Sequence, residues 1–267
     1  MEYDPIKNKL GIFFNASPAM RKLFYKLLDL LLLRTWHIHK EVKNWAKNAP
    51  AKANILDAGM GFGQYSFWIA SKHPNWNIFG VDVKDDQVAD CNKFFTQTGR
   101  TNAKFEVADL TKFSKPDTFD FALSVDVMEH ILEDVEVFKN INAALHKGGM
   151  LLISTPSDQG GSDAEESGES FIGEHVRNGY NIKEIEEKLI KGGFTKVEAK
   201  YSYGTSGHIS WVLSMKWPMK ILAVTKAFII LLPFYYLITF PFCLILNAMD
   251  RDGTHKTGTG LIVKAWK

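Results

Sequence analysis

A short apolar run followed by alternating glycines constrains the fold of this chain more than any other part of its sequence. Residues 55–63 read Ile-Leu-Asp-Ala-Gly-Met-Gly-Phe-Gly, and residues 64–72 continue with apolar side chains at helical spacing. Alternating glycines let the backbone bend sharply and approach a ligand with no side chain in the way. The stretch therefore predicts a buried strand, a tight turn and a helix, an arrangement that holds a nucleotide-like cofactor.

The spacing of these glycines distinguishes two classes of cofactor. A dinucleotide-binding fingerprint is G-x-G-x-x-G, with its third glycine close to the following helix. Here Gly59, Gly61 and Gly63 alternate strictly, and Gln64 stands where the fingerprint reserves a place for glycine. Asp57 lies two residues before the first glycine, where a carboxylate would repel a pyrophosphate but would suit a cationic aminoacyl group. The spacing therefore favours a cationic cofactor that carries no phosphate.

Acidic residues also end the next predicted strands. Asp82 ends the second strand, 25 residues after Asp57, where acids of nucleotide-binding α/β folds accept hydrogen bonds from ribose hydroxyls. Asp109 and Asp126 follow the third and fourth strands. Ligands of open α/β sheets bind at the carboxyl ends of the strands, so we expect these acids to share one edge. The predicted strands after the first span residues 77–83, 103–107, 119–125, 149–154, 195–203 and 261–266.

This series of motifs resembles the class I S-adenosylmethionine-dependent methyltransferases, of the type 11 and ubiquinone-biosynthesis-like kind, over about residues 50–156. The resemblance implies an α/β fold with a Rossmann-like, seven-stranded, mostly parallel sheet and helices on both faces. It implies S-adenosylmethionine as the cofactor, with the carboxylate of Asp109 at the exocyclic amine of adenine and Leu110 at its ring. The implied cofactor-binding residues are Asp57, Gly59, Gly61, Gly63, Asp82, Val83, Asp109, Leu110 and Asp126.

The length of 267 residues accommodates one such domain with additions. Ser17 and Pro18 form a helix-start signal, and the leucines that follow form an apolar stripe. That stripe either packs on the domain and caps the cofactor, or faces a membrane or product channel. The predicted organisation is an N-terminal helical extension over 1–50, the cofactor-binding domain over 51–203, a hydrophobic helical insertion between strands six and seven over 204–260, and the final strand over 261–267.

The insertion contains a long apolar stretch. Residues 227–246 carry no charge over 20 residues, enough to span the hydrocarbon core of a bilayer as one helix, although two prolines interrupt the run. Because the strands on both sides are predicted in one sheet, the insertion must leave and return on the same side, which excludes a single crossing. A re-entrant or in-plane hairpin and a buried helical lid remain. Basic residues and Trp217 near the run favour peripheral membrane contact through residues 216–249.

Composition narrows the expected partners. The formal net charge of +2 is too small to argue for nucleic acid, and no nucleic-acid motif is present. The chain also lacks the Asn/Asp-Pro-Pro-aromatic step of many enzymes that methylate nucleobase or glutamine amines, so a small lipophilic substrate is expected. Cys91 and Cys243 lie far apart, and no secretory signal follows Met1. We expect a cytoplasmic protein, peripheral at the inner face of the membrane, and leave its oligomeric state open.

Methyl transfer is an in-line displacement on an activated sulfonium, so the protein mainly positions the nucleophile and removes its proton where needed. Two histidines are candidate bases, His130 after the fourth strand and His175 in a loop after the fifth. Arg177 is a candidate anion or orientation contact, and Tyr180 a candidate ring contact. Each histidine has a structural alternative: His175 could bond the backbone, and His130 could stabilise the turn after the fourth strand.

A metal site is a further alternative after the fourth strand, although the leading prediction is that no metal is bound. The acid-x-x-acid-His pattern there is similar to that of ubiquinone-pathway O-methyltransferases, in which a divalent ion helps to ionise a catechol-like hydroxyl. This resemblance implies Asp126, Glu129 and His130 as the ligands, a chemically suitable set of oxygen and nitrogen donors.

Three functions fit the sequence. The leading prediction is an S-adenosylmethionine-dependent methyltransferase that acts at oxygen or carbon of a lipophilic small molecule, such as a phenol, a quinone or a lipid-linked aromatic. The first alternative is a phospholipid or amine N-methyltransferase, for which a proton-removing base is not essential. The second alternative is a non-catalytic membrane-peripheral scaffold.

Overall fold

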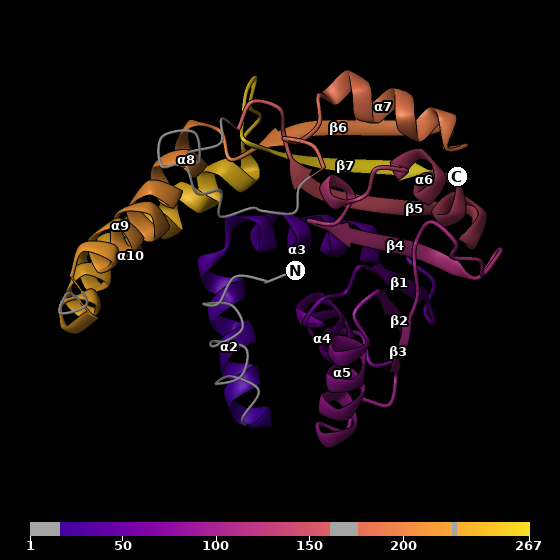
Figure 1. Ribbon diagram of the computed structural model, residues 1–267, viewed down its shortest axis with the longest axis horizontal. Coiled ribbons are helices and arrows are strands. Elements are labelled where there is room, and N and C mark those ends of the chain that lie inside the picture. Colours follow the sequence, from indigo (N-terminus) through magenta and orange to yellow (C-terminus); the bar gives the residue numbers. More distant parts are fainter. Residues whose placement is uncertain (1–16, 161–175, 226–228) are drawn as a thin grey trace.

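The computed structural model describes residues 17–160, 176–225 and 229–267, arranged around one sheet (Figure 1). Seven strands follow the spatial order β3-β2-β1-β4-β5-β7-β6, in which β7 runs antiparallel to both neighbours and the other adjacent pairs are parallel. The predicted seven-stranded, mostly parallel sheet is confirmed. The strands are β1 (Asn54–Ala58), β2 (Asn77–Asp82), β3 (Ala103–Val107), β4 (Phe119–Val125), β5 (Leu145–Pro156), β6 (Lys196–Ser202) and β7 (Gly260–Trp266).

Helices cover both faces of the sheet, so consecutive residues of β1 pack into two different cores. Ile55 packs into the core beneath α3, α4 and α5, while Leu56 packs into the core beneath α6 and α7. A strand covered on both faces needs apolar side chains on both, which explains the continuous apolar runs in the sequence. The helices near the sheet are α2 (Pro18–Leu31), α3 (Leu33–Ala46), α4 (Gln64–Lys72), α5 (Asp85–Gln97), η1 (Met128–His130), α6 (Asp134–Ala144) and α7 (Ile182–Lys191).

The N-terminal extension forms two helices. Ser17 caps α2, and its side chain accepts a hydrogen bond from the backbone N–H of Met20 at 3.2 Å, as the helix-start signal predicts. Leu32 then adopts an extended conformation and separates α2 from α3. The bend lets α2 contact α5 through its first turn while α3 packs on the sheet, two contacts that one straight helix could not make together.

Of the two orientations left open for the apolar stripe of α2, its exposed leucines face outward, while Phe24 packs against the core. The helix also packs through Arg21 and Tyr25, whose side chains are buried. The Arg21 guanidinium contacts the carboxylate of Asp90 at 2.5 Å and the carbonyl oxygen of Phe62 at 2.7 Å, and such pairing is what makes a buried charge tolerable. The exposed leucines of α2 are Leu23, Leu27 and Leu30.

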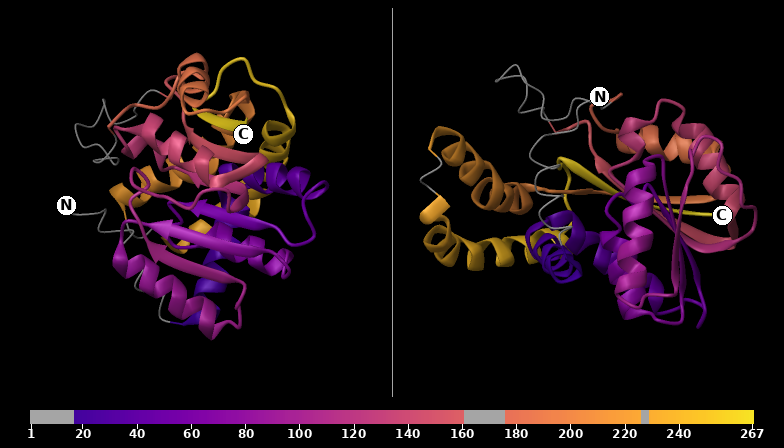
Figure 2. Two further views of the ribbon diagram at one scale, coloured as in Figure 1. Left: turned by 90° about the vertical axis from the view of Figure 1, so that its right-hand side faces the viewer. Right: turned by 60° about the horizontal axis from the view of Figure 1, so that its bottom comes forward.

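The insertion leaves and returns at one end of the sheet, where Ser202 of β6 pairs with Gly260 of β7. Figures 1 and 2 show it as a hairpin that projects from the domain. Its outgoing arm is α8 (Thr205–Trp211), η2 (Val212–Lys216) and α9 (Trp217–Val224), and its returning arm is α10 (Leu232–Asp252). We call the described residues of this insertion, 205–225 and 229–252, the hairpin. Among the described helices, α10 is long and apolar enough to cross a membrane, and 11% of its apolar window is buried. A lid buried on the domain is therefore not what forms.

Candidate active site

The glycine-rich turn joins β1 to α4 at the carboxyl end of the sheet. Gly59, Gly61 and Gly63 have φ angles of 81°, 50° and 71°, which residues with a side chain rarely adopt. A Cβ atom on Gly59 would lie 2.3 Å from Cγ2 of Val127, so the loop after β4 also requires glycine at this position. A Cβ atom on Gly61 would meet no described atom within 4 Å. The turn therefore offers open backbone beside Gly61, as close approach of a cofactor requires.

Asp82 ends β2 directly beside this turn. Its carboxylate accepts hydrogen bonds from the backbone N–H groups of Gly61 at 3.0 Å and Lys84 at 3.1 Å. The next residue, Val83, is exposed. A fixed carboxylate next to open glycine backbone and an exposed apolar side chain fits the ribose and base of a nucleoside. These residues therefore fit the predicted S-adenosylmethionine.

Asp57 places a second carboxylate near the turn. The side chain is buried and accepts a hydrogen bond from Oγ of Ser66 at 2.6 Å. Burial raises the pKa of Asp57 to about 6 despite the Ser66 hydrogen bond, and the negative charge of Asp82 raises it too. Two carboxylates that repel each other favour a positively charged ligand, because the ligand would offset their repulsion.

Asp126 follows β4 in the left-handed conformation, with a φ angle of 52°. Its carboxylate forms an ion pair with the guanidinium of Arg34, near the start of α3. The backbone N–H of Arg34 donates to the hydroxyl oxygen of Tyr203 at 3.0 Å, so Arg34 joins the chain after β4 to the chain after β6. Sequence reasoning missed Arg34 and Tyr203, because no local signal reports contacts over separations of 92 and 169 residues.

The ion pair is open to exchange. The side chains of Arg34 and Asp126 are 38% and 32% exposed. A pair in such a setting contributes about 0–1 kcal/mol to stability, so a ligand that carries both charges can replace it at small cost. The Nε atom of Arg34 is buried and has no hydrogen-bond partner in the described part of the chain. The geometry therefore offers an acceptor and a donor for a zwitterionic ligand.

Residues 50–204, more than half of the chain, match the protein family described as Methyltransferase domain. The chain belongs to this family. Curated relatives are phosphoethanolamine N-methyltransferase 2 of Caenorhabditis elegans, 24% identical over 162 residues, and phosphoethanolamine N-methyltransferase of Triticum aestivum, 31% identical over 151 residues. The alignments cover 60% and 55% of this chain but 36% and 28% of the relatives, so the chain spans about a third of their length.

A solved structure shares the fold of this methyltransferase. Phosphoethanolamine N-methyltransferase 2 of Haemonchus contortus, in complex with phosphomonomethylethanolamine and S-adenosylhomocysteine, superimposes with a TM-score of 0.59 and is 19% identical. The match covers 86% of this chain and 52% of that chain. The predicted class, a class I S-adenosylmethionine-dependent methyltransferase, is confirmed, and with it the cofactor of the class.

In this methyltransferase the residues after β3 are engaged locally. The carboxylate of Asp109 accepts hydrogen bonds from the backbone N–H of Thr111 at 2.9 Å and from its hydroxyl at 2.7 Å, and these bonds lower the pKa of Asp109. Leu110 is buried while Asp109 is exposed. The adenine contacts expected of both residues stay a prediction.

The alternative metal site after β4 does not form. Glu129 is buried, its carboxylate accepts a hydrogen bond from Oγ1 of Thr155 at 3.0 Å, and burial raises its pKa. His130 is exposed, and Asp126 pairs with Arg34. No group of three His, Cys, Asp or Glu side chains within the described residues is arranged to hold a metal ion. The role of His130 as a base stays a prediction.

Arg177 and Tyr180 hold a buried acid at the start of α6. The hydroxyl of the fully buried Tyr180 donates to the carboxylate of Asp134 at 2.7 Å, and Arg177 forms an ion pair with the same carboxylate. These contacts account for both side chains, so we assign neither of them a catalytic role, and their substrate contacts stay a prediction. His175 lies outside the described residues, and its role as a base also stays a prediction.

Proposed function

We propose that this methyltransferase transfers the methyl group of S-adenosylmethionine to the nitrogen of an ethanolamine phosphate group, either free or as the headgroup of a phospholipid. The observation that carries the proposal is the Arg34–Asp126 ion pair, because it lies next to the glycine turn through the contact of Val127 with Gly59. The carboxylate suits an ammonium or amine, and the guanidinium suits a phosphate. A substrate with both groups could exchange partners with the pair.

The comparisons support the same class of acceptor. The two curated relatives and the solved structure all bear the name phosphoethanolamine N-methyltransferase. Methylation of a lipophilic phenol or quinone at oxygen or carbon, the leading prediction from the sequence, has no support among these three. We therefore adopt the amine alternative.

Bound S-adenosylmethionine supplies a methyl group on a sulfonium, whose carbon–sulfur bond breaks as the new carbon–nitrogen bond forms. The contribution of Asp126 is to hold the amine by a hydrogen bond, so that the nitrogen lone pair is in line with the methyl group. Arg34 fixes the other end of the substrate by binding its phosphate. An ammonium must lose one proton before it can attack, and Asp126 or the exposed His130 four residues further on is the group that would accept it.

The direct test offers the full chain radiolabelled S-adenosylmethionine with phosphoethanolamine, with vesicles that contain phosphatidylethanolamine, and with a catechol. We expect label on the nitrogen of at least one of the first two acceptors, identified by mass spectrometry of the product. Transfer to the catechol alone would refute the proposal. Cofactor binding without transfer to any of the three would refute it as well and would favour the scaffold alternative.

Variants of the ion pair test the site itself. Arg34→Gln and Asp126→Asn each remove one charge that a zwitterionic substrate would use. Because a charge-assisted hydrogen bond contributes about 1.5–3 kcal/mol, we expect KM for the amine to rise about 10- to 100-fold in each variant. Cofactor affinity should change less than about twofold in Arg34→Gln, whereas Asp126 is also an expected cofactor contact, so its variant is judged on KM for the amine. Asp117→Asn is the matched control, since Asp117 also has a positive φ angle and pairs with Lys267, but precedes β4. An unchanged KM in both variants would show that Arg34 and Asp126 do not bind the amine substrate.

A further inference from the structure

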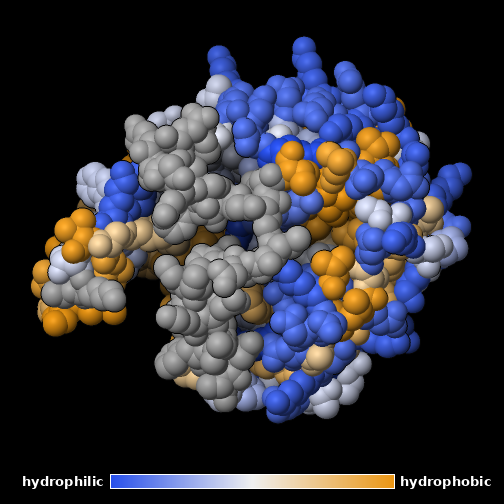
Figure 3. Space-filling view, viewed as in Figure 1, coloured by the Kyte–Doolittle hydropathy of each residue, from blue (hydrophilic) through white to orange (hydrophobic). Residues whose placement is uncertain are grey.

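The hairpin exposes large apolar side chains on the outside of both arms. Leu237 and Phe242 of α10 are 75% and 61% exposed. Figure 3 shows hydrophobic side chains at the end of the hairpin that projects furthest from the domain. A contiguous exposed apolar surface of this kind marks an interface, because water contact with it is unfavourable. The other exposed large apolar residues of this region are Ile209, Trp217, Met219, Val224, Ile229, Ile230, Leu231, Phe234, Ile238, Ile245 and Met249.

Two tyrosine hydroxyls of α10 donate hydrogen bonds to the other arm of the hairpin. The hydroxyl of Tyr235 donates to the carbonyl oxygen of Leu213 at 2.6 Å. The hydroxyl of Tyr236 donates to the backbone carbonyl oxygen of Ser214 at 2.7 Å. A polar group without a partner is strongly unfavourable inside a bilayer, so internal pairing with an apolar exterior suits a lipid environment. A soluble lid would instead keep its apolar side chains against the domain.

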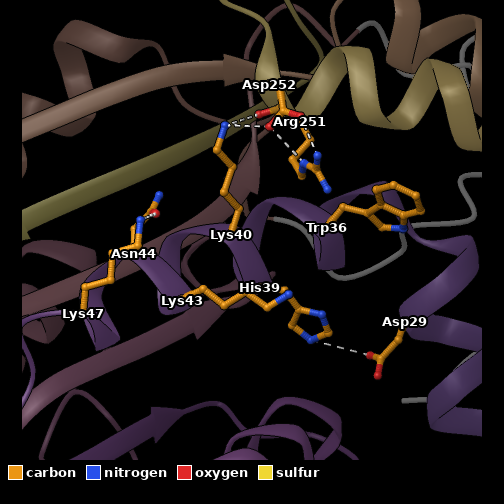
Figure 4. Close-up of a pocket in the computed structure, with 9 residues that line it drawn as sticks. All are labelled: Asp29, Trp36, His39, Lys40, Lys43, Asn44, Lys47, Arg251 and Asp252. Carbon is orange, nitrogen blue, oxygen red and sulfur yellow. Dashed lines mark hydrogen bonds and ion pairs between the residues drawn. The ribbon is translucent and has the colours of Figure 1, made fainter.

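A basic groove of about 450 Å³ lies at the root of the hairpin, between α2, α3 and α10 (Figure 4). Four basic side chains line it, against two carboxylates. Lys40 and Arg251 pair with Asp252, whereas Lys43 lies over the ring of Trp68 at 6.0 Å and Lys47 donates to the amide oxygen of Asn44. The groove therefore keeps an excess of positive charge. Its lining residues are Asp29, Trp36, His39, Lys40, Lys43, Asn44, Lys47, Arg251 and Asp252.

Helix α2 adds an amphipathic border to the same root, since it supplies Asp29 to the groove. Its exposed leucines alternate with Lys22 and Lys26, which are also exposed. Leucines beside lysines on one helix surface are typical of helices that lie in the plane of a membrane interface. The apolar side chains are thus on the hairpin and α2, and the groove adds a cluster of positive charges at the root.

We infer that the hairpin inserts into a phospholipid bilayer from one side and that the basic groove binds the phosphate of an anionic phospholipid at the membrane surface. The charge complementarity between the groove and an anionic headgroup selects a bilayer over other occupants of the apolar surface, and Lys216 and Lys220 of the outgoing arm add positive charge that anionic lipids would also attract. The inference goes beyond the proposed function, since docking requires no methyl transfer.

Vesicle flotation tests the docking directly, with the full chain and without S-adenosylmethionine. One set of vesicles contains phosphatidylcholine alone, and the other also contains phosphatidylglycerol. We expect the chain to float with the anionic vesicles and to bind them less at high salt, because salt screens the charges in the groove. No flotation with either set would overturn the inference.

Two matched pairs of variants separate the apolar and basic contributions. Leu237→Glu combined with Phe242→Glu should lower vesicle partition by at least about 100-fold, since even one charge in the apolar phase costs about 3 kcal/mol. Ile190→Glu is the control, on the exposed surface of α7. Lys43→Gln combined with Lys47→Gln should lower partition into anionic vesicles about tenfold and leave phosphatidylcholine vesicles unaffected. Lys183→Gln combined with Lys191→Gln on α7 is its control.

Three results would overturn the inference. The first is flotation that the double glutamate variant retains in full. The second is evidence that the apolar surface joins two copies of the chain. In that case the wild type would be a dimer, the double glutamate variant would be a monomer, and neither would bind vesicles. The third is equal binding by the lysine variant and its control. Because flotation needs no turnover, docking without methyl transfer would refute only the proposed function, and methyl transfer without docking would refute only this inference.

Discussion

The sheet and the hairpin are both built from long apolar runs, yet their side chains meet opposite environments. Phe121 in the middle of β4 has no exposed surface, whereas Phe242 in α10 is 61% exposed. Hydropathy cannot separate the two, because the residue type is the same. The difference lies in the neighbours: helices cover both faces of the sheet, whereas the hairpin packs on the domain at its root, where α10 contacts α3, and its exposed side chains have no such cover. An apolar run therefore indicates side chains that are stable when covered, but it does not indicate whether other parts of the same chain cover them.

The largest expected difference comes from the same substitution in both regions. Phe121→Ala should lower the free energy of unfolding by about 3–5 kcal/mol, because it removes buried contacts and leaves a cavity. Phe242→Ala should change it by less than about 0.5 kcal/mol, as for other exposed positions. Urea unfolding of the two variants without lipid checks this. A large loss for Phe242→Ala would show that the side chain is buried in solution, and the contrast between the regions would fail.

A second test removes the contacts of Asp250, which connect the hairpin to the sheet region and which we call the joint. The buried carboxylate of Asp250, near the end of α10, accepts hydrogen bonds from the backbone N–H groups of Tyr203 and Gly207 at 3.1 Å and lies 2.9 Å from Nε2 of His37. Each buried donor that loses its partner costs about 1–3 kcal/mol. Asp250→Ala should therefore lower the free energy of unfolding by about 3 kcal/mol and should speed proteolysis of the hairpin.

The conservative variant Asp250→Asn is the control for the joint. The asparagine keeps one acceptor oxygen, so it should retain part of the stability that the alanine loses. A urea midpoint equal to that of the wild type in Asp250→Ala would show that the joint contributes little and that the hairpin is attached by other contacts.

The third test measures how much a buried charge in the sheet region, that of ionised Asp57, lowers the free energy of unfolding. The pKa of Asp57 is raised from 3.8 to about 6 by burial, so the ionised side chain destabilises the fold as the pH rises through about 6, and this cost is absent below about pH 4. Asp57→Asn should raise the free energy of unfolding by about 3 kcal/mol at about pH 8, and the gain should vanish at about pH 4. Urea unfolding at both pH values checks the sign.

Isothermal titration of the same Asp57→Asn variant with S-adenosylmethionine completes that test. We expect weaker binding at neutral pH, because the neutral amide no longer attracts the cationic cofactor. In the urea experiment, a gain in the free energy of unfolding that is the same at about pH 8 and about pH 4 would show that ionisation of the buried carboxylate does not destabilise the fold.

Local signals were enough to predict the strands that hold the site. The ranges expected for the third and fourth strands and for the helix after the glycine turn coincide with β3, β4 and α4. Such segments are specified by their own residues, through apolar periodicity and through glycines that must adopt positive φ angles. The acids at the strand ends were predictable for the same reason, because the positions of Asp82 and Asp126 depend only on where the strands end.

Contacts between distant segments could not be predicted in this way. The buried ion pair of Arg21 is one example, because its partner Asp90 lies 69 residues later and nothing near Arg21 signals that pairing. Arg34 was missed for the same reason. Tyr180 was expected to contact a substrate from its loop position, whereas Asp134, 46 residues earlier, draws its hydroxyl into the core. Side chains whose role depends on a remote partner are thus the ones that need the structure.

The pairing of Ser202 with Gly260 has a consequence for how such a chain can evolve. Residues opposite each other in antiparallel strands lie about 5 Å apart between their Cα atoms, so a tight turn would suffice to connect them. Seen from the sheet, the whole hairpin is an enlarged loop between adjacent strands. It can lengthen, shorten or be exchanged over generations while every strand keeps its order and register. A family of enzymes can in this way acquire or lose an attachment device without rebuilding the domain that binds the cofactor.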